Sequence, residues 1–296
     1  MRPLDIVVGV AFAGVAAFAA WRAGALTRGG ALAALAVGAL TYASGTIGFT
    51  LVLLAFFIPS VLLSRLGKAR KRALLDIGKG GARDAMQVLA NGGVATACAV
   101  AWALTHDVRW ASAFSGAYAA ATADTWATEI GTLARKQPRS ILTLRPIPTG
   151  LSGGITLPGT LAEIAGAVWI GIIALPAIAL AYLGSSSGDF GLSWRSDYVW
   201  VRLGTFGSSS AADIASIVLI LAAIPLAGIA GATLDSILGA TLQELRYCET
   251  CGRSCETNPH ACGSPTRRIR GLRGVSNDLV NLLATAAGAL VAFVLI

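Results

Sequence analysis

Acidic side chains interrupt strongly apolar stretches of this chain, and three of them are candidates for chemistry. Asp124 and Glu129 lie in the segment 110–132, and Asp235 lies in the segment 210–243. A carboxylate at the centre of a membrane helix costs about 2.5–3.5 kcal/mol on insertion scales, so an acid in such a place indicates a function. Nearby hydroxyl groups add oxygen donors: those of Thr125, Thr128 and Ser236. Because Mg²⁺ and Mn²⁺ prefer oxygen ligands, we expect the three acids to bind such an ion and to be the catalytic residues.

A structural ion pair with a nearby arginine is the alternative for each of these acids. The spacing of the first two also restricts them. Residues five apart diverge by about 140° around a helix, so Asp124 and Glu129 face one pocket only if the helix unwinds or ends near Gly131. Non-helical backbone at membrane depth is tolerated where it lines a cavity. A broken helix at the site is therefore one expectation.

A basic and glycine-rich stretch follows the first two acids. Its candidate phosphate-binding residues are Lys136, Arg139, Arg145, Gly150, Ser152, Gly153, Gly154 and Thr160. Backbone N–H groups of a glycine-rich turn before a helix bind phosphate, and the cations balance its charge. The pattern matches neither the P-loop nor the dinucleotide-binding fingerprint. We expect this stretch to bind the phosphates of a nucleotide or of an acceptor.

Two further polar groups begin apolar segments. Asn91 lies near the start of the segment 87–105, and the last apolar segment begins with a group consisting of Asn277, Asp278 and Asn281. These residues could contact phosphate. Asp278 could equally be a first-turn acid favoured by the helix dipole, and Asn91 could belong to a loop before a helix.

The cysteines cluster in one polar loop. Cys248, Cys251, His260 and Cys262 follow the pattern C-x2-C-x8-H-x-C. Four such ligands suffice for tetrahedral Zn²⁺ and leave no open position, which favours a structural zinc site. The alternative is a set of free thiols, since disulfides are rare in a reducing compartment.

The composition predicts an all-α polytopic transmembrane bundle that must position these groups. Of the 296 residues 55% are hydrophobic and only 13% are charged, whereas soluble domains have about 25% charged residues. We expect one integral membrane domain (1–296) with a Cys/His-rich loop at 246–273. Length and flanking charge predict about eight spans, at 5–21, 30–45, 47–64, 87–105, 110–132, 155–183, 210–243 and 277–296. Six or seven spans are the alternative, because the second and third are poorly separated.

Basic residues predict the orientation of the chain. Seventeen of the 23 lysines and arginines lie in the segments 65–83, 135–145 and 246–273. The positive-inside rule places these loops in the cytoplasm and both termini outside. We expect a plasma membrane of the bacterial type, with the active site on its cytoplasmic side. The net charge of +8 is mostly this topological signal, and no nucleic-acid-binding motif is present.

Several motifs resemble the transmembrane protein 19 / phytyl-phosphate kinase family. They occur in the family's order from about Gln87 to the C-terminus. The motifs are ADTWATEIG at 123–131, TGLSGG at 149–154, Gly159-Thr160, DSILGATLQ at 235–243, the Cys-x2-Cys loop and Asn277-Asp-x-x-Asn281. The sequence departs from the family pattern at Glu163, where a small or hydroxyl residue is expected, and in having the additional Cys255. We therefore assign no catalytic role to Glu163.

The resemblance implies a kinase that converts a prenyl monophosphate to the diphosphate. Phytyl-, geranylgeranyl- or farnesyl-phosphate is the implied acceptor, CTP or another nucleoside triphosphate the donor, and a divalent metal the cofactor. The prenyl tail would lie between apolar helices, open to membrane lipid. Two alternatives share these features. One is a transporter of a small or anionic solute, whose acids should lie near the membrane midplane. The other is a lipid nucleotidyltransferase, which would release pyrophosphate.

Overall fold

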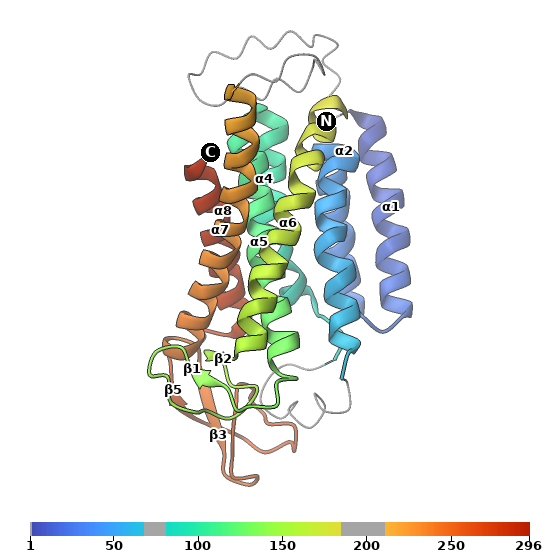
Figure 1. Ribbon diagram of the computed structural model, residues 1–296. Coiled ribbons are helices and arrows are strands. Elements are labelled where there is room, and N and C mark those ends of the chain that lie inside the picture. The colour runs from blue at the N-terminus through green and yellow to red at the C-terminus, as the bar shows by residue number, and fades with distance from the viewer. Residues whose placement is uncertain (1, 68–80, 185–210) are drawn as a thin grey trace.

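Seven helices form a single bundle in the computed structural model, which describes residues 2–67, 81–184 and 211–296 (Figure 1). The helices are α1 (Pro3–Arg22), α2 (Arg28–Arg65), α4 (Ala85–Thr105), α5 (Val108–Gly131), α6 (Leu157–Gly184), α7 (Ala211–Thr241) and α8 (Asn277–Leu295). Most of the basic segment 65–83 lies outside the described residues, as does the connection between α6 and α7 at 185–210.

Helix α2 folds back on itself. Gly45 and Thr46 leave the helical conformation, and Thr46 has a φ of 49°. Arg65 at the end of α2 donates a hydrogen bond to the carbonyl of Ala23, which precedes the start of α2, at 3.4 Å. The two halves of α2 therefore run in opposite directions, as Figure 1 also shows. These halves correspond to the spans predicted at 30–45 and 47–64, so the chain makes eight passes along the bundle.

Helix α5 lies at the centre and packs against α2, α4, α6, α7 and α8. Every residue from Ala111 to Ala123 is buried, and most are alanine, serine or glycine. Among the described helices, all except α5 are long and apolar enough to cross a membrane. Helix α5 needs less hydrophobicity because its neighbours are protein rather than lipid. The prediction of an all-α polytopic membrane protein is confirmed.

Close approach to α5 depends on glycines of the neighbouring helices. A Cβ on Gly231 of α7 would lie 2.5 Å from Cβ of Ala120 and 2.7 Å from the carbonyl oxygen of Ala284. A Cβ on Gly93 of α4 would make only an ordinary contact, 4.0 Å from Cβ of Leu89.

The substitution Gly231→Ala should therefore destabilise the protein by about 1–3 kcal/mol, because the helices must separate to admit the methyl group. The matched change Gly93→Ala should be neutral or stabilising by about 0.5–1 kcal/mol, since alanine favours helix. Thermal unfolding in detergent compares the two variants. Equal loss of stability in both would contradict this account of the packing.

Two small antiparallel sheets lie at one end of the bundle, where the sequence predicts only loops. The first pairs β1 (Arg139–Ser140) with β2 (Gly154–Ile155). The second has the order β4-β3-β5 and consists of β3 (Leu245–Cys248), β4 (Arg253–Cys255) and β5 (Arg267–Arg270). We call this the loop end: α5 and α7 finish here, and α6 and α8 begin here (Figure 1). Helix α1 begins and α8 finishes at the opposite end.

Candidate functional site

A small pocket opens between α5, α6 and α7 near the loop end. Its lining side chains carry carboxylates and hydroxyls, and its backbone comes from β2 and the turn before α6. The lining residues are Asp124, Ala127, Thr128, Gly154, Ile155, Thr156, Gly159, Thr160, Glu163, Ala232 and Ser236. The pocket thus joins the first predicted acid to the glycine-rich stretch and to α7.

The acids of the three helices lie at a similar depth. Asp124 is seven residues from the end of α5, Glu163 six residues from the start of α6, and Asp235 six residues from the end of α7. At a rise of 1.5 Å per residue these side chains branch from the helices about 10 Å inside the loop end. The site is therefore near one end of the bundle and not at its middle.

Small residues allow α5 and α6 to approach closely beside the pocket. Cβ atoms added to Gly159 and Gly166 would lie 3.0 Å from the carbonyl oxygen of Ala127 and 3.1 Å from that of Thr122. Any larger side chain at either position would separate the helices that bring Asp124 and Glu163 together.

Like charges are concentrated in this site. Asp124 interacts electrostatically with Glu163 and Glu129, and Asp235 interacts with Asp124 and with Glu256. Among the described residues, the buried Oδ2 of Asp235 has no hydrogen-bond partner. Several carboxylates at one site repel one another unless a cation neutralises them. An unpaired buried carboxylate oxygen beside other oxygen donors fits a divalent cation such as Mg²⁺ or Mn²⁺.

Glu129 differs from the other predicted acids. Like Asp235, it is not a lining residue of the pocket, but it lies close enough to Arg83 to interact with it electrostatically, whereas the charges that act on Asp124 and Asp235 are those of other carboxylates. Burial lowers the pKa of the Arg83 guanidinium, and Glu129 opposes that shift. The arginine also lies over the ring of Phe56, 6.0 Å from its centroid. The interaction with Arg83 favours the ion-pair alternative for Glu129, and helix α5 continues through Asp124 to Gly131 without the expected break.

Neutralising Asp124 and neutralising Glu129 should change the stability of the protein in opposite directions. Asp124→Asn removes one of several like charges, so the protein without added divalent cations should become more stable. Glu129→Gln removes an acidic neighbour of the half-buried Arg83 guanidinium and should cost about 1–3 kcal/mol. Thermal unfolding of both variants in the same detergent tests this difference. A stability change of the same sign in both would show that their environments are alike.

The glycine-rich loop packs against the end of α7. Gly153 has a φ of 82°, and a Cβ there would lie 2.5 Å from Cβ of Ala240. The next residue, Gly154, lines the pocket. Gly150, at the start of the loop, is exposed and has a φ of 90°. Ser152 donates a hydrogen bond from its hydroxyl to Oε1 of Glu256 at 2.5 Å. The loop therefore connects the pocket both to α7 and to the Cys/His-rich segment.

The predicted cations lie outside the pocket lining. Lys136, Arg139 and Arg145 are exposed on the connection between α5 and β2, at the same end of the bundle. Arg139 donates a hydrogen bond to the carbonyl of Leu144 at 2.7 Å. Thr125 also does not line the pocket.

The polar groups of α4 and α8 form a separate region of the loop end. Asn91 donates to the carbonyl of its own helix at Gln87, at 3.0 Å. The hydroxyl of Thr285 donates to the carbonyl of Ala90 at 3.0 Å, which places α8 beside α4. In the first turns of α8, Asp278 is buried, and none of the predicted residues of this region lines the pocket: Asn91, Asn277, Asp278 and Asn281.

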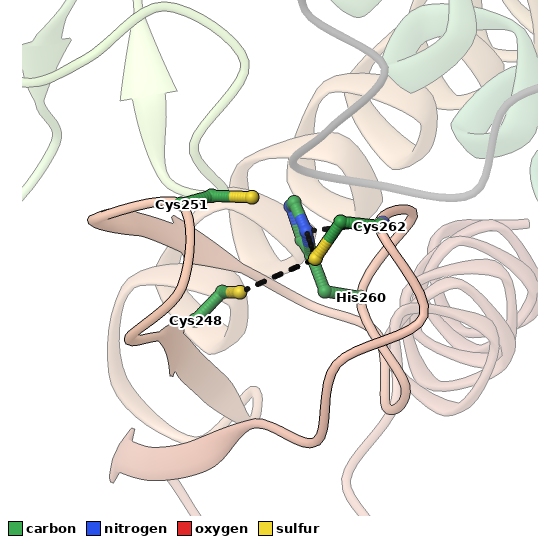
Figure 2. Close-up of side chains that lie close together, drawn as sticks. All are labelled: Cys248, Cys251, His260 and Cys262. Atoms are coloured by element: carbon green, nitrogen blue, oxygen red, sulfur yellow. Dashed lines mark hydrogen bonds between the residues drawn. The ribbon is translucent and has the colours of Figure 1, made fainter.

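Cys248, Cys251, His260 and Cys262 point toward one another (Figure 2). Four potential ligand atoms, one from each, lie within 4.8 Å of one another. The two Sγ atoms of Cys248 and Cys262 are 3.7 Å apart, and Nδ1 of His260 is 3.1 Å from Sγ of Cys262. Hydrogen bonds from Ser264 and then from His260 lower the pKa of the Cys262 thiol to about 6, which favours the thiolate that a metal binds. The four residues predicted as zinc ligands are thus close together.

Two carboxylates at or beside this site were not among the predicted site residues. Glu163 lines the pocket and accepts a hydrogen bond from the hydroxyl of Thr233 at 3.4 Å. Glu256 directly follows β4, and burial raises its pKa while the hydrogen bond from Ser152 opposes the shift. The signal for Glu163 was its place inside an apolar segment, whereas Glu256 is an acid in a polar loop and carries no such signal.

Comparisons with known proteins agree on the class of molecule. A family profile described as "Integral membrane protein DUF92" matches residues 11–289. Protein PGR of Arabidopsis thaliana is 28% identical over 295 residues, which cover 94% of this chain and 92% of that protein. An uncharacterised membrane protein of Methanocaldococcus jannaschii is 37% identical over 126 residues, covering 42% of this chain and 51% of that protein. One from Synechocystis is 29% identical over 203 residues, covering 65% and 62%. No solved structure matches the chain.

Proposed function

The chain belongs to the DUF92 family of integral membrane proteins, and from its carboxylate-lined pocket we propose that it is a membrane-embedded kinase. It would transfer a phosphoryl group from a nucleoside triphosphate to phytyl-, geranylgeranyl- or farnesyl-phosphate and so form the diphosphate. CTP is the donor that the resemblance to phytyl-phosphate kinases implies. The observation that carries the proposal is the group of carboxylates beside a glycine-rich backbone, about 10 Å inside one end of the bundle.

Phosphoryl transfer requires chiefly positioning and charge neutralisation from the protein. Asp124, Glu163 and Asp235 would hold Mg²⁺ or Mn²⁺, which supplies positive charge to the donor phosphates when bound. The hydroxyls of Thr128, Thr160 and Ser236 and the backbone at Gly154 would orient the phosphates.

The acceptor is a phosphate monoester that is already ionised at neutral pH, so the reaction needs no strong general base. One of its oxygens would form a bond to the γ-phosphorus, and the bond between that phosphorus and the oxygen bridging it to the β-phosphorus would break. The nucleoside diphosphate then leaves. Lys136, Arg139 and Arg145, exposed on the neighbouring connection, would meet the phosphates of a nucleotide that approaches from water.

A prenyl tail has an apolar surface next to the pocket. Helix α6 exposes Leu157, Leu161, Ile164 and Val168, which recur at helical spacing along one face. Thr160 and Glu163, on the neighbouring face of the same helix, line the pocket. A lipid phosphate could therefore place its head group among the carboxylates while its tail follows α6 into the membrane.

The pocket would open to the cytoplasm. The described basic residues of the three predicted cytoplasmic segments lie at the loop end, with the pocket. The positive-inside rule assigns this end to the cytoplasm, where nucleoside triphosphates occur. The depth of the acids also argues against a transporter, whose binding site is expected near the midplane.

The test is an assay of purified, lipid-reconstituted protein with CTP, Mg²⁺ and each of the three prenyl monophosphates in turn. We expect formation of at least one prenyl diphosphate, detected by mass spectrometry. Absence of diphosphate with all three acceptors, with CTP and ATP as donors, would contradict the proposed reaction.

A further inference from the structure

The residues from β3 to β5, 245–270, form a lobe that we call the Cys/His lobe. Cys248 and Cys251 lie on the β3–β4 hairpin, and His260 and Cys262 lie on the segment between β4 and β5. The four side chains thus join two parts of the lobe that lie apart in sequence (Figure 2).

The spacing of these ligands fits tetrahedral zinc. A Zn–S bond of about 2.3 Å places two sulfurs of a tetrahedral site about 3.8 Å apart, and Sγ of Cys248 and Cys262 are separated by 3.7 Å. His260 is only 4% exposed, and among the described residues its Nε2 has no hydrogen-bond partner. Three cysteines and one histidine constitute a closed structural zinc site, with no position left for a substrate.

One side of the lobe is fixed directly to the bundle. The guanidinium of Arg270 donates to the carbonyl of Gly239 at 3.2 Å, and the backbone N–H of Leu272 donates to the carbonyl of Leu242 at 2.9 Å. These bonds hold β5, and through it β3, against the end of α7.

The segment 256–266 is held in position by other contacts. Thr266 closes it by hydrogen bonds from its hydroxyl to the carbonyl of Thr257 and from its backbone N–H to Oδ1 of Asn258. His260 and Cys262 then connect it to the β3–β4 hairpin. Glu256 begins this segment, four residues before His260, so the position of its carboxylate depends on how the segment is held.

Glu256 interacts with two elements that flank the pocket, the glycine-rich loop and α7. Its Oε1 accepts the hydrogen bond from Ser152 in the glycine-rich loop, and its charge interacts with that of Asp235 on α7. Glu256 does not line the pocket itself. It is therefore placed to fix the loop that carries Gly154 relative to the acids.

We propose that Cys248, Cys251, His260 and Cys262 bind one Zn²⁺, and that this ion holds Glu256 as a positioning residue for the carboxylate pocket. The evidence for the zinc site is the arrangement of its four ligands, and it does not depend on the proposed function. The role of Glu256 in phosphoryl transfer rests in addition on the proposed function.

Metal analysis of protein purified without chelator tests the zinc site. We expect about one zinc per chain, and its loss in Cys251→Ser, together with a lower temperature of unfolding. Cys255→Ser is the matched control, because Cys255 is a buried cysteine of the same lobe that lies outside the ligand group. Zinc content that is negligible in the native protein, or unchanged in Cys251→Ser, would overturn the site.

Binding of Mn²⁺, followed by electron paramagnetic resonance, tests the connection to the pocket without any assumption about substrate. Glu256→Gln should keep its zinc yet weaken Mn²⁺ binding about tenfold, as loss of a supporting group around a metal site does. Glu249→Gln is the control, since Glu249 is an exposed acid of the same lobe, 3.5 Å from Arg267. Equal Mn²⁺ affinity in Glu256→Gln and Glu249→Gln would refute the positioning role.

The zinc-depleted Cys251→Ser protein should bind Mn²⁺ about as weakly as Glu256→Gln does, whereas Cys255→Ser should keep the native Mn²⁺ affinity. Native Mn²⁺ affinity in zinc-depleted, folded Cys251→Ser protein would show that zinc does not position Glu256. If the native protein binds zinc and Mn²⁺ in this pattern but forms no prenyl diphosphate, the proposed reaction fails and the zinc inference stands.

Discussion

Asp235→Asn should lower phosphoryl transfer by about 100-fold or more while leaving a folded, membrane-inserted protein. Oδ2 of Asp235 is buried without a hydrogen-bond partner among the described residues, and the carboxylate interacts electrostatically with Asp124. An amide keeps the shape of the side chain but removes the negative charge that a divalent cation needs. Asp124→Asn should have a similar effect, because Asp124 lines the pocket.

Asp5→Asn is the control for this experiment. Asp5 lies in the first turn of α1, at the opposite end of the bundle, where it pairs with Arg2 at 2.9 Å. Initial rates at saturating Mg²⁺, with size-exclusion profiles as a check of folding, compare the three variants. Native rates in both Asp235→Asn and Asp124→Asn would remove the catalytic assignment of these acids.

Gly153→Ala should reduce turnover about 100-fold through a different cause, the displacement of the glycine-rich loop. The added methyl group would lie 2.5 Å from Cβ of Ala240, so the loop must move away from α7. Gly154, the next residue, lines the pocket, and a displacement of about 1 Å in a positioning group can cost about 100-fold in rate.

Gly24→Ala separates this displacement from simple backbone strain. Gly24 also has a positive φ, 70°, but an added Cβ would have no heavy atom within 4 Å. Alanine at a positive φ should destabilise both variants by a similar amount, about 1–2 kcal/mol, but only Gly153→Ala should have a lower turnover rate. The comparison uses rates measured at a temperature where both proteins are folded; similar rates in the two would show that the loop does not position the pocket.

Much of the fold could be predicted because membrane spans carry strong local signals. Hydrophobic length and loop charge identified the paired spans at 30–45 and 47–64, which the structure contains as the two halves of α2. The central place of α5 could not be predicted in this way. Its residues are small rather than strongly hydrophobic, and burial by five neighbouring helices follows only from the complete packing.

The candidate site could be predicted only where its residues interrupt apolar segments. Asp124 and Asp235 stand out for that reason, and they are close enough to interact. The difference between Glu129, which interacts with Arg83, and Glu163, which lines the pocket, depends on contacts between distant segments. Glu256 joins the site through a lobe whose strands are too short and too polar for a clear pattern.

Transfer of label from CTP to a prenyl monophosphate tests the central claim most directly. With the reconstituted protein, geranylgeranyl or phytyl monophosphate and Mg²⁺, we predict labelled prenyl diphosphate from CTP that carries ³²P in the γ-position and none from CTP labelled in the α-position. Asp235→Asn should nearly abolish the γ-label transfer. Label from the α-position in the lipid would identify a nucleotidyltransferase, and absence of lipid label from either nucleotide would contradict phosphoryl transfer by this pocket.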